Sequence, residues 1–239
     1  MELWFRVRDF FRYTLREKKD IIIAVLVMAF VFGYNDGSSD LEYSSWLFNL
    51  LKVLFIVYLS IMVRVAFQKI VALSQGFSVE FRAWPTGLAI GVIVALLSNG
   101  HLYVLLFGGL VFYHMTLLRF GKFRYGENAS TRGMIAASGS FANLVLATIG
   151  MMFSAQLGIF PDFFEQFAFI NFWLMIFSLL PFPKMDGIHV FFMSRLVYVF
   201  IFSTLFAYIL LTFVDVYSWL LSFIIGVVCW LLFYIYFEQ

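Results

Sequence analysis

A few polar side chains lie within or beside long apolar stretches of this sequence, and these are the residues that could form ion pairs, donate or accept hydrogen bonds, or bind a metal. Arg64 and Gln68 stand four residues apart in one stretch, Asn143 lies inside another, and Asp186 and His189 follow a third. Polar groups in apolar surroundings are costly unless they are paired or hydrogen-bonded. Their types allow an ion pair between Arg64 and Asp186, hydrogen bonding by the two amides, or metal binding by the carboxylate and the imidazole.

Metal binding would depend on Asp186 and His189, which are three residues apart and share a face if the segment is helical. A catalytic zinc needs about three protein ligands. His101 follows Asn-Gly in a predicted turn, His114 lies within an apolar stretch, and Cys229, the only cysteine, lies in the last one. None of these is expected to supply the third ligand. We therefore expect no cofactor, with zinc held by Asp186 and His189 as the alternative.

The composition predicts a membrane protein. Of the 239 residues, 63% are hydrophobic and only 13% are charged, which is unlike an average soluble domain. Apolar stretches recur from Ile21 to Phe237 with short polar breaks, whereas a soluble fold would collect them in one core. The small formal charge of +2 argues against nucleic-acid binding. We expect an integral protein of the cell (cytoplasmic) membrane, with the lipid bilayer as its surroundings.

Eight apolar stretches divide the chain. They cover approximately residues 21–34, 46–71, 86–98, 102–118, 134–157, 163–180, 196–213 and 217–236. Crossing a ~30 Å hydrocarbon core takes ~20 helical residues, so the stretches at 21–34 and 86–98 are short and the other six are long enough. The expected fold class is an all-α polytopic membrane protein with six to eight spans. Residues 77–82 alternate like a strand, which adds a short strand or a re-entrant segment near 77–100.

Residues 1–20 are predicted to form an interfacial amphipathic segment, ahead of a single transmembrane domain over 21–239. Apolar side chains recur there at helical spacing, at Leu3, Trp4, Val7, Phe11 and Leu15. Lys and Arg gather before the first span and in alternate loops, whereas the opposite loops carry Asp and Glu. This asymmetry predicts a cytoplasmic N-terminus.

Three segments resemble motifs of the site-2 protease family of intramembrane zinc metalloproteases. The sequence RVAFQK at residues 64–69, with the alternating segment after it, is similar to the family's zinc-binding helix. ASGSFANL at 137–144 is similar to its small-residue and asparagine motif, and LLPFPKMDG at 179–187 to the motif that supplies the third zinc ligand. The resemblance implies a protease-like core over about 46–194, with additional C-terminal spans at 196–238.

The same resemblance implies that the family's catalytic residues are replaced here. In such an enzyme, two histidines at i and i+4 bind Zn²⁺ and an adjacent glutamate acts as general base. The matching positions hold Arg64, Val65 and Gln68. A guanidinium has no lone pair for a cation, valine cannot move a proton, and a neutral amide oxygen is a poor zinc ligand. Asp186 is the one family ligand retained, so hydrolysis by the family's mechanism is not expected.

By the resemblance, the positions of Arg64 and Asp186 would both lie at one metal ion. Because opposite charges at membrane depth seek each other, we expect these two side chains to pair. The alternative is that Arg64 reaches water or lipid phosphate while Asp186 caps a helix.

The function expected from these features is that of a pseudoprotease, which binds transmembrane segments or a membrane-protein partner without cleaving them. The candidate binding residues are Asn143, Phe81, Asp186 and Gly187, and a strand edge at 77–82 would receive an extended peptide by β-augmentation. The alternative is an active intramembrane zinc metalloprotease with atypical ligands. Transport or scaffolding unrelated to proteolysis is a third class.

Overall fold

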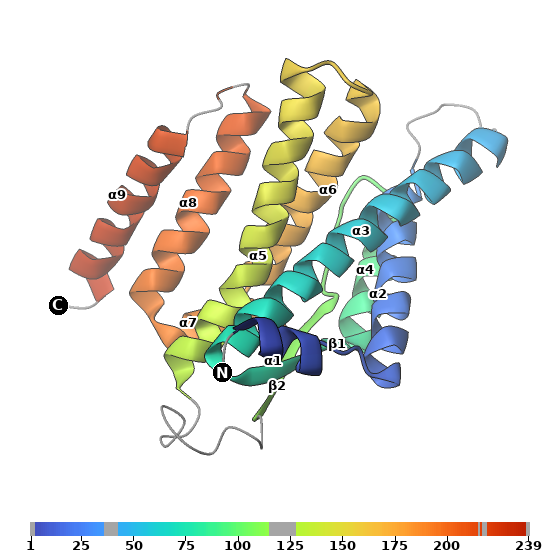
Figure 1. The fold of residues 1–239 in the computed structure, drawn as a ribbon. Coiled ribbons are helices and arrows are strands. Elements are labelled where there is room, and N and C mark those ends of the chain that lie inside the picture. The colour runs from blue at the N-terminus through green and yellow to red at the C-terminus, as the bar shows by residue number, and fades with distance from the viewer. Residues whose placement is uncertain (1–2, 36–42, 115–127, 215, 217–218, 238–239) are drawn as a thin grey trace.

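The chain folds into a bundle of helices with one small sheet, as seen in a computed structural model that describes residues 3–35, 43–114, 128–214, 216 and 219–237 (Figure 1). Its elements are α1 (Leu3–Phe10), α2 (Leu15–Gly33), α3 (Tyr43–Gln75), β1 (Phe77–Ala83), α4 (Pro85–Leu97), β2 (Gly108–His114), α5 (Ala129–Met151), the π-helical turn η3 (Met152–Gln156), α6 (Pro161–Leu179), α7 (Gly187–Met193), α8 (Arg195–Phe213) and α9 (Trp219–Phe237).

Four helices within the described residues are long and apolar enough to cross a membrane. They are Tyr43–Gln75, Ala129–Ala155, Arg195–Thr212 and Trp219–Phe237. These helices indicate a membrane protein. The expected six to eight spans are not confirmed. The apolar stretches at 21–34 and 163–180 lie in α2 and α6, but α2 opens with five charged residues in succession, 16–20, and α6 carries Asp162 and Glu165 in its first turns.

The apolar stretch at residues 102–118, whose length alone would allow a span, is not a spanning helix in its described part, because residues 108–114 form strand β2. β2 pairs antiparallel with β1, from Phe77 opposite His114 to Ala83 opposite Gly108. Between the strands, α4 has 13 residues, which reach only about 20 Å at 1.5 Å per residue. The segment 77–114 therefore leaves one end of the bundle and returns to it, in the form of a strand, a short helix and a second strand.

Glycines on α4 let the returning chain lie directly against the helix. A Cβ on Gly91 would come within 2.5 Å of the Val104 carbonyl oxygen, and Gly87 packs in the same way on the carbonyl of Leu106. At the far end the chain reverses at Asn99 and Gly100, both with positive φ. Close packing on a glycine face, followed by a tight turn, explains why this apolar segment folds back and does not continue as a helix.

α5 and α6 lie at the centre of the helix packing. α3 packs on α5, α2 packs on α3 and α4, and α7 lies against α5, while α8 and α9 form an outer pair. Figure 1 shows α9 at the edge farthest from α2. Within α9 only Ser222 and Gly226 are buried. The buried core thus lies among α2, α3, the β1–β2 ribbon, α5 and α6, which is where the candidate polar residues gather.

The N-terminal segment is not one continuous helix through Leu15. α1 ends at Phe10, residues 11–14 run without helix, and Thr14 begins α2 by accepting a hydrogen bond from the Glu17 amide on its side-chain oxygen. This N-cap satisfies one of the free amides of the new helix and fixes its start.

Substitution of Gly91 by alanine tests the packing of the returning chain. The new methyl group would meet backbone at Val104, so we expect a loss of about 1–3 kcal/mol in unfolding free energy, measured by thermal or denaturant unfolding in detergent. Gly33→Ala is the matched control, because the atom nearest to its Cβ would be the flexible end of Leu50 at 3.0 Å, and the nearest backbone atom would lie at an ordinary contact distance of 3.4 Å. Equal stability of both variants and the wild type would contradict this packing.

Candidate functional site

A buried ion pair between Arg64 and Asp186 forms the centre of the candidate site. Arg64 Nη2 lies 2.5 Å from Asp186 Oδ2, and both residues are only 1% exposed. Arg64 comes from the middle of α3, and Asp186 lies at the end of the turn that precedes α7. The alternative arrangement is not the one seen in this structure: Arg64 is buried, and Asp186, although it is the N-cap residue of α7, makes no capping hydrogen bond with its side chain.

Both oxygens of the Asp186 carboxylate are engaged. Besides Arg64, Oδ2 accepts a hydrogen bond from Gln68 Nε2 at 2.8 Å, and Oδ1 accepts one from the backbone amide of Leu110 on β2 at 3.0 Å. Gln68 Nε2 also lies 3.3 Å from the Ala136 carbonyl oxygen on α5. The structure therefore brings Arg64, Gln68 and Asp186 together, and three donors converge on one carboxylate.

Three glycines make room for this arrangement. A side chain on Gly139 of α5 would collide with Gln68, one on Gly109 of β2 would lie 2.8 Å from Asp186 Oδ1, and one on Gly187 would collide with the Leu179 carbonyl. The Arg64 guanidinium also lies over the Phe107 ring, 5.5 Å from its centroid, a cation–π contact that stabilises a buried cation. The small residues of the two later motifs thus serve the packing of the ion pair.

A second buried ion pair, between Lys69 and Glu17, lies farther along α3 and was not foreseen from the sequence. Lys69 Nζ is 2.9 Å from Glu17 Oε2 and also donates to the Val79 carbonyl oxygen at 2.9 Å. Glu17 Oε1 accepts the backbone amide of Phe81 at 3.0 Å. Glu17 and Lys69 are 0% and 5% exposed. The signal was present in Lys69, a lysine inside an apolar helix, but its partner stands among charged residues and looked like a surface group.

The two carboxylates bind opposite edges of the β1–β2 ribbon at one position. Phe81 and Leu110 face each other across the ribbon, and their amides point outward, to Glu17 and to Asp186 respectively. At Phe81, β1 is therefore paired with β2 on one side and bonded to Glu17 on the other. The side chain of Phe81 is 1% exposed and packs on Phe107 at a centroid distance of 6.4 Å.

Several buried polar atoms beside the Arg64 pair make no hydrogen bond within the described residues. They are Arg64 Nη1, Gln68 Oε1 and both polar atoms of the Asn143 amide. Asn143 is one turn after Gly139 on the buried face of α5 and is 0% exposed. Unpaired buried polar groups cost about 1–3 kcal/mol each. The interface between α3 and α5 therefore has hydrogen-bonding capacity that the described part of the chain does not use.

His189 lies on α7, with its ring 5.0 Å from that of Phe112. Burial is the main cause that lowers its pKa below the ordinary 6.5, and Arg132 adds to this, while Asp186 and a backbone hydrogen bond to Leu110 oppose it. The imidazole is therefore neutral at pH 7. Among the described residues, no three His, Cys, Asp or Glu side chains gather where they could hold a metal ion.

His101, His114 and Cys229 make no contact with the pair among those that the structure describes, whereas Val65 is the neighbour of Arg64 on α3. His101 hydrogen-bonds with Asn35 through its Nδ1, at 3.1 Å, in the turn after α4. His114 ends β2, since the described part of the apolar stretch around it forms a strand. Cys229 is half-buried on α9. Val65 is fully buried beside Arg64.

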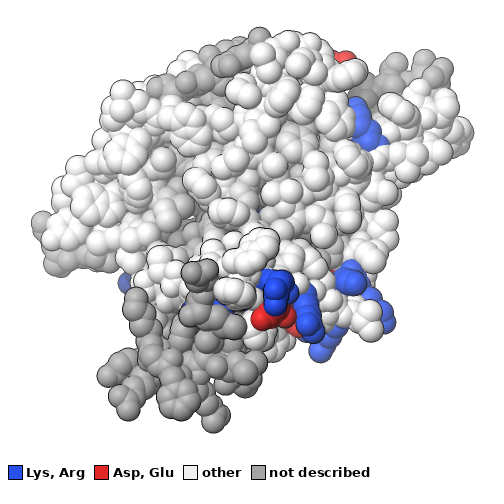
Figure 2. All heavy atoms as spheres, in the orientation of Figure 1, with Lys and Arg blue, Asp and Glu red and all other residues white. Residues whose placement is uncertain are grey.

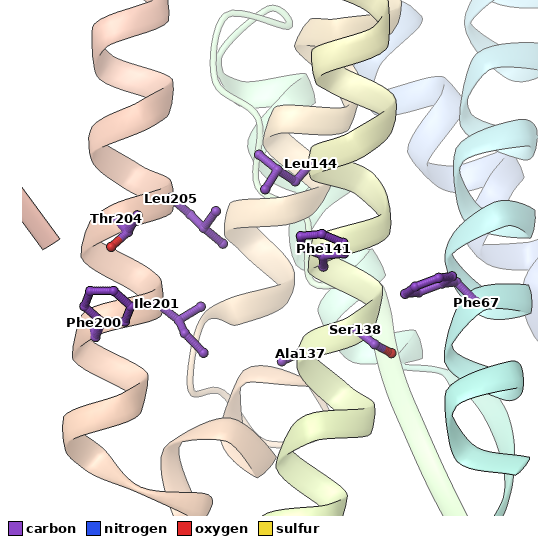
Figure 3. A pocket seen from close by; sticks show the side chains of 9 residues that line it. All are labelled: Phe67, Ala137, Ser138, Phe141, Leu144, Phe200, Ile201, Thr204 and Leu205. Atoms are coloured by element: carbon purple, nitrogen blue, oxygen red, sulfur yellow. The ribbon is translucent and has the colours of Figure 1, made fainter. Parts of the chain in front are cut away.

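An apolar groove of about 480 Å³ lies on the outer side of α5, between α3 and α8 (Figure 3). Its lining side chains are Ala137, Ser138, Phe141 and Leu144 of α5, Phe200, Ile201, Thr204 and Leu205 of α8, and Phe67 of α3. Figure 3 shows Phe67 extending from α3 toward α5 on one side of the groove, and Ile201 and Leu205 extending from α8 toward α5 on the other. Phe67 and Gln68 are adjacent on α3, and Ser138 and Gly139 are adjacent on α5, so the groove and the ion pair share the same two helices.

Comparison with known proteins gives one informative similarity. The chain is 29% identical over 180 residues to a protein of Methanocaldococcus jannaschii described as "Putative zinc metalloprotease", a match that covers 74% of this chain and 84% of that protein. No protein-family model matches the chain. No solved structure matches it significantly. At 29% identity, this similarity supports a relationship to a metalloprotease-like family.

Removal of the guanidinium tests the role of the buried pair. Arg64→Leu leaves a buried carboxylate without its cation, and we expect a loss of about 3–5 kcal/mol in unfolding free energy. Adding Asp186→Asn to Arg64→Leu removes the uncompensated charge, so the double variant should be more stable than Arg64→Leu alone. Unfolding in mixed detergent measures both. If the double variant loses as much unfolding free energy as Arg64→Leu and Asp186→Asn lose separately when added together, the two side chains do not interact.

Proposed function

We propose that this protein is a non-catalytic relative of intramembrane zinc metalloproteases, a pseudoprotease that binds a transmembrane segment of a membrane partner. The observation that carries the proposal is the Arg64–Gln68–Asp186 network. By the resemblance, these three residues stand at the positions of zinc ligands, and in this chain they bond to one another.

The residues around Asp186 do not fit a zinc ion. Zinc sites need lone pairs on nitrogen, sulfur or oxygen, whereas Arg64 Nη2, Gln68 Nε2 and the Leu110 amide all present hydrogens to the carboxylate. Arg64 carries a permanent positive charge that repels a divalent cation. The guanidinium instead takes the role of the cation that holds the core helices together, and Val65 provides no general base.

The groove between α3, α5 and α8 supports binding of a helical segment. It is lined by aromatic and aliphatic side chains from three helices, and an apolar helix from a partner would fill it by van der Waals packing. Ala137 and Ser138 allow close approach of a second backbone, as small residues do at helix interfaces in membranes. The unused polar atoms of Asn143 and Gln68 lie on the same two helices but are buried between them, so the groove itself offers mainly apolar contacts.

The β1–β2 ribbon gives less support to binding by β-augmentation at its centre. The outward amides at Phe81 and Leu110 already bond to Glu17 and Asp186. A peptide strand would have to displace a buried carboxylate to pair there. We therefore place the partner in the apolar groove.

An active zinc metalloprotease is the alternative function, favoured by the description of the similar Methanocaldococcus protein. It would require Asp186 to leave Arg64 and join His189 and a further ligand. Cleavage of a membrane-embedded substrate by the purified protein, lost in Asp186→Ala and inhibited by a zinc chelator, would establish this alternative and reject the pseudoprotease.

Site-specific photo-crosslinking tests the groove as the binding surface. A benzoylphenylalanine in place of Phe141, in native membranes, should crosslink to a spanning segment of another protein, and the same probe at Tyr236, 76% exposed on α9, should not. Ala137→Trp should abolish the Phe141 crosslink by filling the groove, whereas Val228→Trp on α9 should leave it intact.

Equal crosslinking at both positions, or a Phe141 crosslink that survives Ala137→Trp, would contradict binding in the groove.

A further inference from the structure

Exposed cations gather at one end of the molecule, over α1 and the start of α2. Figure 2 shows most of the visible surface without charge and a group of Lys and Arg side chains at its lower right, where Figure 1 places these elements. The exposed basic residues of this segment are Arg8, Arg12, Arg16, Lys18 and Lys19. We call these five residues the basic patch.

The acidic side chains described in this segment are already paired. Asp9 lies 3.4 Å from Arg8, Asp20 lies 3.3 Å from Arg82, and Glu17 is buried against Lys69. Arg12, Arg16, Lys18 and Lys19 make no ion pair with any described residue of the chain. The patch therefore presents at least four uncompensated positive charges to its surroundings.

The patch lies where a membrane interface would meet the bundle. Lys18 and Lys19 precede Ile22 and Ile23 by four residues, about 6 Å along the axis, on the same face of α2. Ile22 and Ile23 are 56% and 48% exposed, as lipid-facing residues are. Cations one turn outside a lipid-facing surface stand at the depth of phospholipid headgroups.

α1 is fixed to the bundle by one cation, which leaves its other face to the surroundings. Arg6 Nη1 donates to the carbonyl oxygens of Leu73 and Ser74 at the end of α3, at 3.1 and 3.2 Å. On the opposite side, Trp4 is 71% exposed, and Leu15 beyond α1 is 79% exposed. Exposed Trp and Leu among cations are typical of segments that insert their apolar side chains at the headgroup boundary.

We propose that the basic patch binds anionic phospholipid headgroups in the leaflet at this end of the protein. Lipid phosphates supply negative charge to four cations that have no acidic partner among the described residues, namely Arg12, Arg16, Lys18 and Lys19. Trp4 and Leu15 favour a lipid surface over an acidic soluble protein, because their apolar side chains find hydrocarbon only in the membrane. The binding is independent of the groove and of the ion pair at Asp186.

Lipid selectivity of the reconstituted protein tests the proposal. In phosphatidylcholine vesicles that contain a minor share of phosphatidylglycerol, electron paramagnetic resonance measures the immobilised fraction of spin-labelled lipids. We expect wild-type protein to prefer spin-labelled phosphatidylglycerol over phosphatidylcholine by about threefold or more at low salt, and less at high salt because salt screens exposed charges.

The variant Arg12→Gln/Arg16→Gln/Lys18→Gln/Lys19→Gln should lose this preference. The matched control Arg12→Lys/Arg16→Lys/Lys18→Arg/Lys19→Arg keeps every charge and should retain it, and circular dichroism checks that both variants are folded. No preference in the wild type, or an unchanged preference in the glutamine variant, would overturn the proposal.

Discussion

The buried carboxylate of Asp186 is the group on which the arrangement of the core depends. A charge without water is stable only when its partners satisfy it, and Asp186 draws its partners from two elements that are distant in sequence: Arg64 and Gln68 on α3 and the Leu110 amide on β2. Glu17 repeats the pattern with Lys69 and the Phe81 amide. The ribbon is thus fixed at both edges by carboxylates whose cations stand five residues apart on α3.

The pairing of Arg64 with Asp186 is the physical basis of the proposed function. Arg64 neutralises Asp186 without a metal ion, because a guanidinium supplies both the charge and directed hydrogen bonds. Under the proposed function, the scaffold around the pair, including the close packing at Gly109, Gly139 and Gly187, would serve binding instead of catalysis. The groove on the other side of α5 offers an apolar surface of the kind that a transmembrane partner needs.

The sequence predicted the polar residues that meet in the core better than it predicted the path of the chain. Arg64, Gln68 and Asp186 stood out because each is polar beside apolar stretches. The sequence does not fix the path of the stretch at 102–118, because an apolar run does not distinguish a buried strand from a helix. In the structure, residues 104–106 pack on the glycines of α4. The break at 11–14 had a local signal, Thr14 three residues before Glu17, which is a capping pattern.

Other features depend on contacts that no local pattern specifies. Glu17 belongs to a run of five charged residues, 16–20, and only the tertiary fold shows that it is buried while Lys18 and Lys19 are exposed. The groove requires three helices at a particular separation, so its lining residues could not be chosen in advance.

Zinc content tests the central claim most directly. The protein, purified without chelator from cells grown with added zinc, should contain far less than stoichiometric zinc by elemental analysis, and Asp186→Ala should not change that content. Stoichiometric zinc in the wild type that disappears in Asp186→Ala would contradict the claim that a guanidinium, and not a metal ion, neutralises this carboxylate.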